Sequence, residues 1–207
     1  MASGGDKTCI IVGGLLNYNE FVDACEKRHI EPAAIDVPRT VYRNGLTFKD
    51  LLKVPGGFFC PLQAEILHAV ADKLRTSKAR TVVCNVCPEI SRYVYAMYKT
   101  AVLKEFPLKR YNDTVKEEEL AFEKALKTYS KVVYVIMTSY DKDKLDRSVN
   151  EQILKGSPPM SPEMEYFYSK QYTDVLPHKL GIIHDKRVVI TISNTRSLED
   201  TFKALNI

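Results

Sequence analysis

The feature that most constrains this chain is the alternation of short, β-branched apolar runs with longer amphipathic stretches. The apolar runs read TCIIV (8–12), RTVVC (80–84) and KVVYVIM (131–137). Short runs that are apolar throughout predict strands buried on both faces, and such strands occur in parallel sheets covered by helices. The sequence therefore predicts an α/β fold, a Rossmann-like three-layer sandwich with a mostly parallel central sheet.

Prolines and one capping pattern predict where the helices begin. Pro61 and Pro88 each suit the first position of a helix, and Phe106-Pro107 stops the second of these helices. Thr114-x-x-Glu117 matches a capping box, in which each side chain satisfies an exposed amide of the first turn. It predicts a helix that runs from about residue 114 to 129.

The C-terminal third has a different character. Residues 157–177 are rich in proline and aromatic residues, and we expect this segment to cover the main body. Residues 180–193, LGIIHDKRVVITIS, predict two strands around His184 to Arg187, which form an antiparallel hairpin at the sheet edge. Residues 194–207 predict a final helix capped by Ser197. A chain of this length fits one domain over residues 1–207.

Composition narrows the class of protein. The chain has 45% hydrophobic and 27% charged residues, a net charge of +4 and five cysteines. The odd cysteine count and the apolar surroundings of most of the thiols predict reduced cysteines in a cytoplasmic protein. The apolar runs are too short to span a membrane, and the N-terminus MASGGDK has no charged leader followed by an apolar stretch. We therefore expect neither secretion nor membrane insertion.

Small and polar residues follow several of the predicted strands. Parallel strands present their carboxyl ends at one edge of the sheet, where ligands of such folds bind. A glycine pair before a helix lets an anion approach free amides, although GGLLNY has only part of a dinucleotide-binding fingerprint. We expect a nucleotide-like or other phosphorylated small ligand at this edge. The candidate binding residues are Gly13, Gly14, Asn17, Thr138, Ser139 and Arg196.

Cys84-x-x-Cys87 lies where a strand passes into a helix and admits several interpretations. A thiol oxidoreductase would use the pair as nucleophiles activated by helix amides, but the pair comes late in the chain and follows Val83. A zinc site would have to recruit Cys25 and His29 from the far end of the first helix, so we expect no metal site. A phosphatase loop from Cys87 needs arginine at position 93, which is Tyr93. Burial of two small apolar side chains is the simplest interpretation.

A rival hypothesis assigns the chain a non-enzymatic role in self-association or nucleic-acid binding. The stretch RYVYAMYK (92–99) interleaves tyrosines with basic residues, a combination that stacks on bases and contacts phosphates. The aromatic residues of the covering segment would form a second binding face. They are Tyr166, Phe167, Tyr168 and Tyr172. The sequence identifies no cofactor and leaves open whether the chain is an enzyme.

Overall fold

The fold is built on one parallel sheet. The computed structural model describes residues 6–14, 18–33, 54–84, 86–137, 162–183, 188–192 and 198–206. Within them the strands follow the order β2-β3-β1-β4-β5, and every pairing is parallel. Their bounds are β1 (Thr8–Gly14), β2 (Glu31–Pro32), β3 (Thr81–Cys84), β4 (Lys131–Met137) and β5 (Val188–Ile192). The predicted α/β class with a parallel sheet is confirmed.

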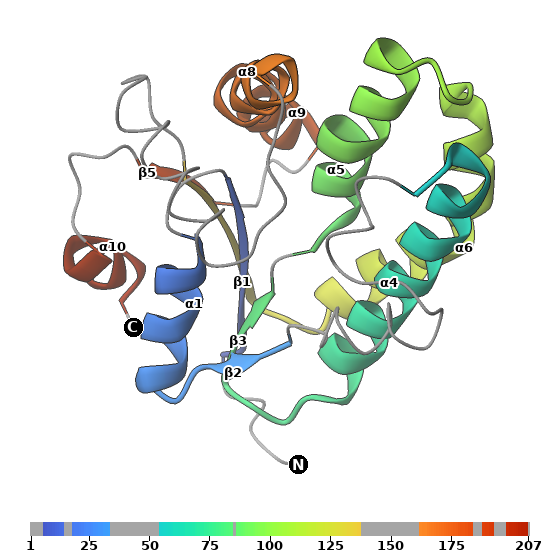
Figure 1. The fold of residues 1–207 in the computed structure, drawn as a ribbon. Coiled ribbons are helices and arrows are strands. Elements are labelled where there is room, and N and C mark those ends of the chain that lie inside the picture. The colour runs from blue at the N-terminus through green and yellow to red at the C-terminus, as the bar shows by residue number, and fades with distance from the viewer. Residues whose placement is uncertain are drawn as a thin grey trace.

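Helices lie on both sides of this sheet (Figure 1). One side carries α1 (Tyr18–Lys27) and α10 (Leu198–Leu205), and the other carries α4 (Gly56–Thr76), α5 (Pro88–Ile90) and α6 (Leu108–Leu126). Near the carboxyl ends of the strands lie α8 (Pro162–Lys170) and α9 (Leu176–Ile183). Among the described residues, no helix combines the length and the apolar character that a membrane span requires.

The central strands are buried because helices cover both of their faces. Cys9 to Val12 of β1 and Val133 to Ile136 of β4 have no exposed surface. Between α1 and α10, the rings of Phe21 and Phe202 stack with their centroids 5.2 Å apart. The guanidinium of Arg28 lies 4.0 Å from the Phe202 ring centre and pairs with Glu199 at 2.6 Å. Phe202 therefore joins α10 to α1, and Leu205 of the same helix is buried in the core as well.

Three segments of the helical layer are π-helical. They are η1 (Ser91–Ala96), η2 (Tyr98–Val102) and η3 (Gln171–Val175). The wider turn is visible in the hydrogen bonds, since the amide of Leu103 donates to the carbonyl of Tyr98, five residues earlier, at 3.1 Å. Segment η1 follows α5 directly and contacts η3. π-Helical turns are rare and are often found at functional sites, so this contact bears on the search for a site.

Pro88 begins α5 as predicted, but two other predicted helix starts are wrong. Helix α4 begins at Gly56, and Pro61 lies inside it. The additional turn is held by Phe59, whose buried ring stacks on Phe106 with centroids 5.8 Å apart. Helix α6 begins directly after Pro107, so Thr114 lies inside it and donates to the carbonyl of Arg110 at 2.8 Å. In both cases buried aromatic side chains extend the helix beyond the local signal.

The predicted antiparallel hairpin at the C-terminal edge is also wrong. Residues 180–183, taken for its first strand, are the last turn of α9. The second strand exists as β5, but it pairs parallel to β4, with Val133 opposite Val188. A short apolar run such as LGII fits a buried helix end as well as a strand. The crossover through η3 and α9 therefore replaces the hairpin.

Truncation of Phe202 tests the α1–α10 packing. Phe202→Ala removes a fully buried ring and should lower the free energy of unfolding by about 3–5 kcal/mol. Lys203→Ala on the same helix, whose side chain is exposed, should change it by less than about 0.5 kcal/mol. Urea unfolding followed by circular dichroism measures both. Equal effects of the two variants would contradict the packing described above.

Candidate ligand site at the carboxyl edge of the sheet

Three adjacent strands end in one row at the carboxyl edge. Gly14 of β1 is the register partner of Met137 of β4, and Met137 is the partner of Ile192 of β5. Neighbouring strands lie about 4.8 Å apart, so the row spans roughly 10 Å. The last described residues of β1, β4 and β5 therefore lie side by side. This row of strand ends is the frame of the candidate site.

The two glycines at the end of β1 are required by close packing. A Cβ on Gly14 would lie 2.0 Å from the carbonyl oxygen of Met137, and the φ of Gly14 is +142°, where side chains are strained. A Cβ on Gly13 would lie 2.6 Å from Cδ1 of Ile90 and 3.1 Å from Cε1 of Tyr172. Ile90 and Tyr172 thus close the edge above Gly13 on the side of α5.

The predicted ligand residues fall into two groups. Gly13 and Gly14 are placed at the edge as described, and α1 begins four residues after Gly14. The other four lie outside the described residues, and their role stays a prediction. They are Asn17, Thr138, Ser139 and Arg196. Ser197, the predicted cap of the final helix, lies outside them as well.

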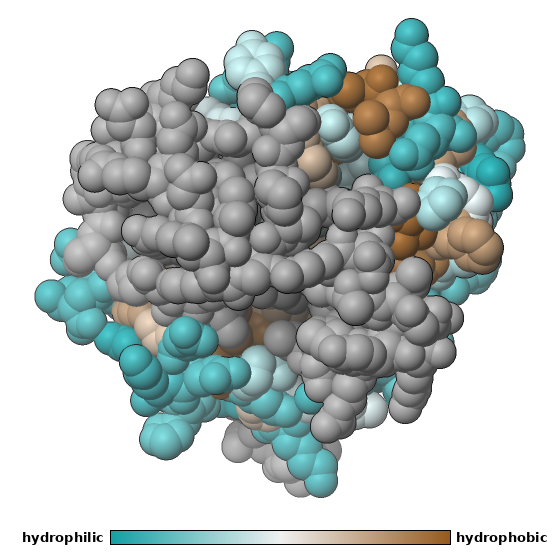
Figure 2. Space-filling view, in the orientation of Figure 1, coloured by the Kyte–Doolittle hydropathy of each residue, from teal (hydrophilic) through white to brown (hydrophobic). Residues whose placement is uncertain are grey.

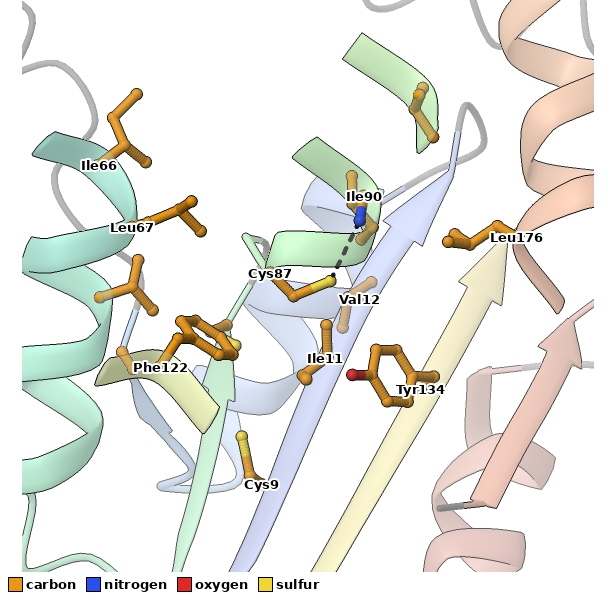
Figure 3. Close-up of a cluster of buried hydrophobic side chains, with 14 of the residues drawn as sticks. Cys9, Ile11, Val12, Ile66, Leu67, Cys87, Ile90, Phe122, Tyr134 and Leu176 are labelled. Carbon is orange, nitrogen blue, oxygen red and sulfur yellow. Dashed lines mark hydrogen bonds between the residues drawn. The ribbon is translucent and has the colours of Figure 1, made fainter. Parts of the chain in front are cut away.

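Cys84 is the last residue of β3, and Cys87 lies at the start of α5. Figure 3 shows Cys87 there, with its sulfur directed at Ile90. Both side chains are buried. Cys87 is the N-cap of α5, where its sulfur accepts a hydrogen bond from the amide of Ile90 at 3.4 Å. The thiol of Cys84 donates to the carbonyl of Val86 at 3.5 Å. These contacts give both cysteines a structural role at the strand-to-helix junction.

The surroundings of the two cysteines favour the thiol over the thiolate. A hydrogen bond with Cys9, together with burial, raises the pKa of Cys84 well above its ordinary value. Burial, with the nearby carboxyl of Glu89, raises the pKa of Cys87 in the same direction. Because the thiolate is the nucleophile and the metal ligand, this arrangement gives no support to a reactive pair. The thiol oxidoreductase hypothesis therefore gains nothing from the geometry.

The zinc and phosphatase readings of this region also find no support. Cys25, the expected third zinc ligand, is fully buried, and burial raises its pKa to about 12. No cluster of three or more histidine, cysteine or acidic side chains suited to a metal occurs in the part of the chain that the structure describes. Arg92, next to the position a phosphatase arginine would take, forms an ion pair with Glu119. The guanidinium of Arg92 is therefore directed at α6, and it does not serve as the phosphate-binding arginine that a loop at Cys87 would need.

The aromatic side chains that self-association or nucleic-acid binding would use are mostly buried. Tyr168 and Tyr172 are buried, and Tyr168 packs edge-on against Tyr95 and Tyr98 of the η1–η2 region, with centroids 5.6 and 5.4 Å away. Of the aromatic residues of the covering segment, Tyr166 is the most exposed, at 72%. In Figure 2, hydrophobic surface is seen at the upper right, over the region of η2 and α6 in Figure 1. The tyrosines thus act mainly within the fold.

The basic residues of the tyrosine helix are also engaged. Lys99 is 4% exposed and donates to the carbonyl of Val54 at 2.9 Å and to the carboxylate of Glu105 at 3.0 Å. Its ammonium lies 5.3 Å from the centre of the Phe59 ring. Lys99 therefore ties η2 to the start of α4. From the sequence, Lys99 was expected to contact a phosphate. The spacing of basic and aromatic residues does not reveal that the Lys99 side chain is buried against a partner of its own.

Sequence reasoning missed the polar contact between η1 and α6. The predicted capping box placed a helix start at residues 114–117, but α6 begins at Leu108, so Glu119 lies in mid-helix, where it pairs with Arg92. Burial raises the pKa of Glu119 to about 7, against a lowering by Arg92, and Glu89 adds to the rise. Pro107 was the sequence signal that could have revealed the earlier start of α6, because a proline can begin a helix as readily as it can end one.

Substitution of Gly14 tests the close approach of β1 and β4. Gly14→Ala should destabilise the protein by more than about 2 kcal/mol, since it combines an unfavourable φ with a backbone clash. Gly57→Ala is the matched control, because a Cβ there meets no atom within 4 Å and lies in the first turns of α4. It should be neutral or stabilise by up to about 1 kcal/mol. Comparable losses from both variants in urea unfolding would contradict the packing of Gly14.

Thiol accessibility tests the structural role of Cys84 and Cys87. All five cysteines are free and buried, so a disulfide-exchange reagent at pH 8 should react with the native protein roughly 100-fold more slowly than with the urea-unfolded chain. The reaction is followed by absorbance of the released thiolate. One or two thiols that react within the mixing time at pH 6 would instead reveal an activated cysteine.

Comparisons with known proteins assign no family. No model of a protein family matches the chain. A search of curated protein sequences likewise gave no match. The geometry of the carboxyl edge is therefore the basis for a functional proposal.

Proposed function

We propose that this chain is a Rossmann-like protein that binds a nucleotide-like or other phosphorylated small ligand at the carboxyl edge of its sheet. The observation that supports this most is the row of strand ends formed by Gly14, Met137 and Ile192. Thr138 and Ser139 follow Met137 directly, and Asn17 and Arg196 follow their strands within four residues. In the sequence, four polar candidate residues thus follow three strands whose ends are neighbours in the sheet.

The topology adds a second argument. The chain leaves β1 for α1 on one face of the sheet, whereas the chain after β4 returns through η3 and α9, which pack against η1 and α5 on the other face. Neighbouring strands whose connections diverge in this way mark a switch point, where a crevice opens outside the carboxyl ends. The order β2-β3-β1-β4-β5 places this point between β1 and β4.

The residue types at this edge suit a phosphate group. The first amides of α1 have no partner within the helix, and the helix dipole favours a negative charge near its start. The hydroxyls of Thr138 and Ser139 and the amide of Asn17 are neutral donors, and the guanidinium of Arg196 adds a charge-assisted donor. Gly14 lets the ligand approach the backbone without a side chain between them.

The alternatives draw less support from the described residues. A nucleic-acid surface on residues 92–99 would need cations that are not engaged, yet Arg92 pairs with Glu119 and Lys99 pairs with Glu105. A thiol oxidoreductase would need a stabilised thiolate, and the pKa of Cys84 and of Cys87 is raised. Ligand binding at the carboxyl edge requires neither unengaged cations on residues 92–99 nor a stabilised thiolate.

A ligand screen tests the proposal. Thermal unfolding is measured with AMP, ADP, ribose 5-phosphate and inorganic phosphate, each at 5 mM. A ligand at 100 times its Kd adds about 2.7 kcal/mol to the stability, which shifts the Tm of a chain of this size by roughly 5–10 °C. A shift with at least one organic phosphate is expected. The absence of any shift across the set would contradict the proposal.

A pair of arginine variants tests where the ligand binds. Arg196→Ala should weaken binding of the active ligand by about 10- to 100-fold, since a charge-assisted hydrogen bond is lost. Arg80→Ala removes the same charge from an exposed residue next to Thr81, at the amino end of β3, and should leave the Kd within about twofold. Isothermal calorimetry measures both. Equal weakening would mean a general charge effect and would move the site away from the carboxyl edge.

A further inference from the structure

The amino ends of the strands carry a surface of basic residues, here named the amino rim. Helices α4 and α6 both end near this edge, and short links return the chain from them to β3 and β4 (Figure 1). Together, residues 6–7, 72–80 and 123–131 contain eight lysines and arginines against three aspartates and glutamates. The whole chain has 30 basic and 26 acidic residues, so its positive excess is concentrated at this edge. The amino rim comprises Lys7, Lys73, Lys78, Arg80, Lys127 and Lys131.

Backbone hydrogen bonds fix the spacing of the central part of the amino rim. The amide of Thr8 donates to the carbonyl of Arg80 at 2.9 Å, and the amide of Lys131 donates to the carbonyl of Lys7 at 3.1 Å. Arg80, Lys7 and Lys131 therefore lie at the starts of three adjacent strands, β3, β1 and β4. Since neighbouring strands lie about 4.8 Å apart, this row of cations spans roughly 10 Å.

Two lysines of the amino rim are held in place by neutral partners. The ammonium of Lys7 donates to the carbonyl of Ser77 at 2.8 Å and lies 5.8 Å from the centre of the Tyr129 ring. The ammonium of Lys131 donates to the carbonyl of Leu205 at 3.3 Å. A carbonyl accepts one of the three N–H bonds of a lysine without cancelling its charge. Both residues therefore keep their full positive charge at this edge.

Other cations of the amino rim are exposed. Lys78, Arg80 and Lys127 are exposed, and no ion pair joins them to an acid in the part of the chain that the structure describes. Lys73 lies in the last turn of α4, where a positive charge complements the helix dipole. Lys78 and Arg80 come after the end of α4, so the dipole does not account for them. Their charges are therefore available to an external anion.

The amino rim offers an anion little besides charge. The exposed large hydrophobic side chains of the described residues belong to other segments. They are Phe58, Leu103, Leu120 and Tyr166. Tyr129, in the link from α6 to β4, is 6% exposed and donates its hydroxyl hydrogen to the carbonyl of Leu74 at 2.9 Å. Single-stranded nucleic acids are held by aromatic stacking, and lipid surfaces by apolar groups together with charge. The phosphates of a duplex require only the cations.

We propose that the amino rim binds the phosphate backbone of a double-stranded nucleic acid without reading its sequence. Each lysine or arginine that contacts a phosphate releases a condensed counterion, and several such contacts add up to a measurable affinity. A mononucleotide has too few phosphates to be held in this way. The amino rim lies at the opposite edge of the sheet from the proposed small-ligand site, so the two proposals stand or fall separately.

Fluorescence anisotropy of a labelled duplex of about 20 base pairs, as DNA and as RNA, tests the proposal with the full-length protein. We expect a Kd of roughly 1–10 μM in about 50 mM KCl for at least one duplex. About five phosphate contacts give a slope of log K against log salt of about −4 to −5, so binding should weaken by roughly 500-fold between about 50 and 200 mM KCl. AMP at 5 mM, in a buffer of equal ionic strength, should not displace the duplex.

Two double variants locate the binding surface. Lys78→Ala with Arg80→Ala should weaken binding of the duplex by at least about tenfold and reduce the magnitude of the salt slope by about 2. Lys116→Ala with Lys170→Ala is the matched control, since it removes the same total charge from exposed residues of α6 and α8 that lie outside the amino rim. It should leave the Kd within about twofold.

Four results would overturn the proposal. The absence of duplex binding in about 50 mM KCl is the first, and equal weakening by the two double variants, which would assign the binding to net charge alone, is the second. A single strand of the same length that binds more tightly than the duplex is the third. The fourth is that vesicles of phosphatidylserine and phosphatidylcholine compete with the duplex as effectively as unlabelled duplex of equal phosphate concentration, which would make a lipid surface the partner.

Discussion

The close backbone contact between β1 and β4 at the carboxyl edge is the constraint on which the rest of the structure depends. Gly14 lies against the Met137 carbonyl so closely that no side chain fits between them, and this contact fixes the level at which both strands end. Parallel pairing with β3 and β5 then extends the sheet on both sides. In the order of the strands, β1 and β4 are therefore direct neighbours whose carboxyl ends lie at one level, the place where we propose that a ligand binds.

The parts of the fold that the sequence predicts are those governed by local composition. The apolar β-branched runs became buried parallel strands, and Pro88 begins α5 because a missing amide costs nothing there. The helix starts assigned to Pro61 and Thr114 were wrong because distant aromatic contacts extend both helices. The hairpin failed for a related reason, since a short apolar run does not reveal whether it packs as a strand or as the last turn of a helix.

The candidate site was less predictable, because its parts come from remote positions in the chain. Gly13 and Gly14 were identified from their position after a predicted strand. Ile90 and Tyr172, which contact that position, are remote in the sequence, so nothing near the glycines predicts them. The ion pair between Arg92 and Glu119 was missed for the same reason, because a buried acid and a surface acid look alike in the sequence of a charged helix. Burial is a property of the packed helices, and it is the main cause of the raised pKa of Cys87 and of Glu119, whereas for Cys84 the hydrogen bond with Cys9 comes first.

We propose that the carboxyl row of β1, β4 and β5 binds a phosphorylated small molecule. Amide NMR shifts of the full chain, recorded while the organic phosphate with the largest thermal effect is titrated, test it most directly. The account predicts that the largest changes cluster at Gly13, Gly14, Met137 and Ile192 and in the segments that follow them. Changes centred on the amino ends of the strands, near Thr8, Thr81 and Lys131, would contradict it.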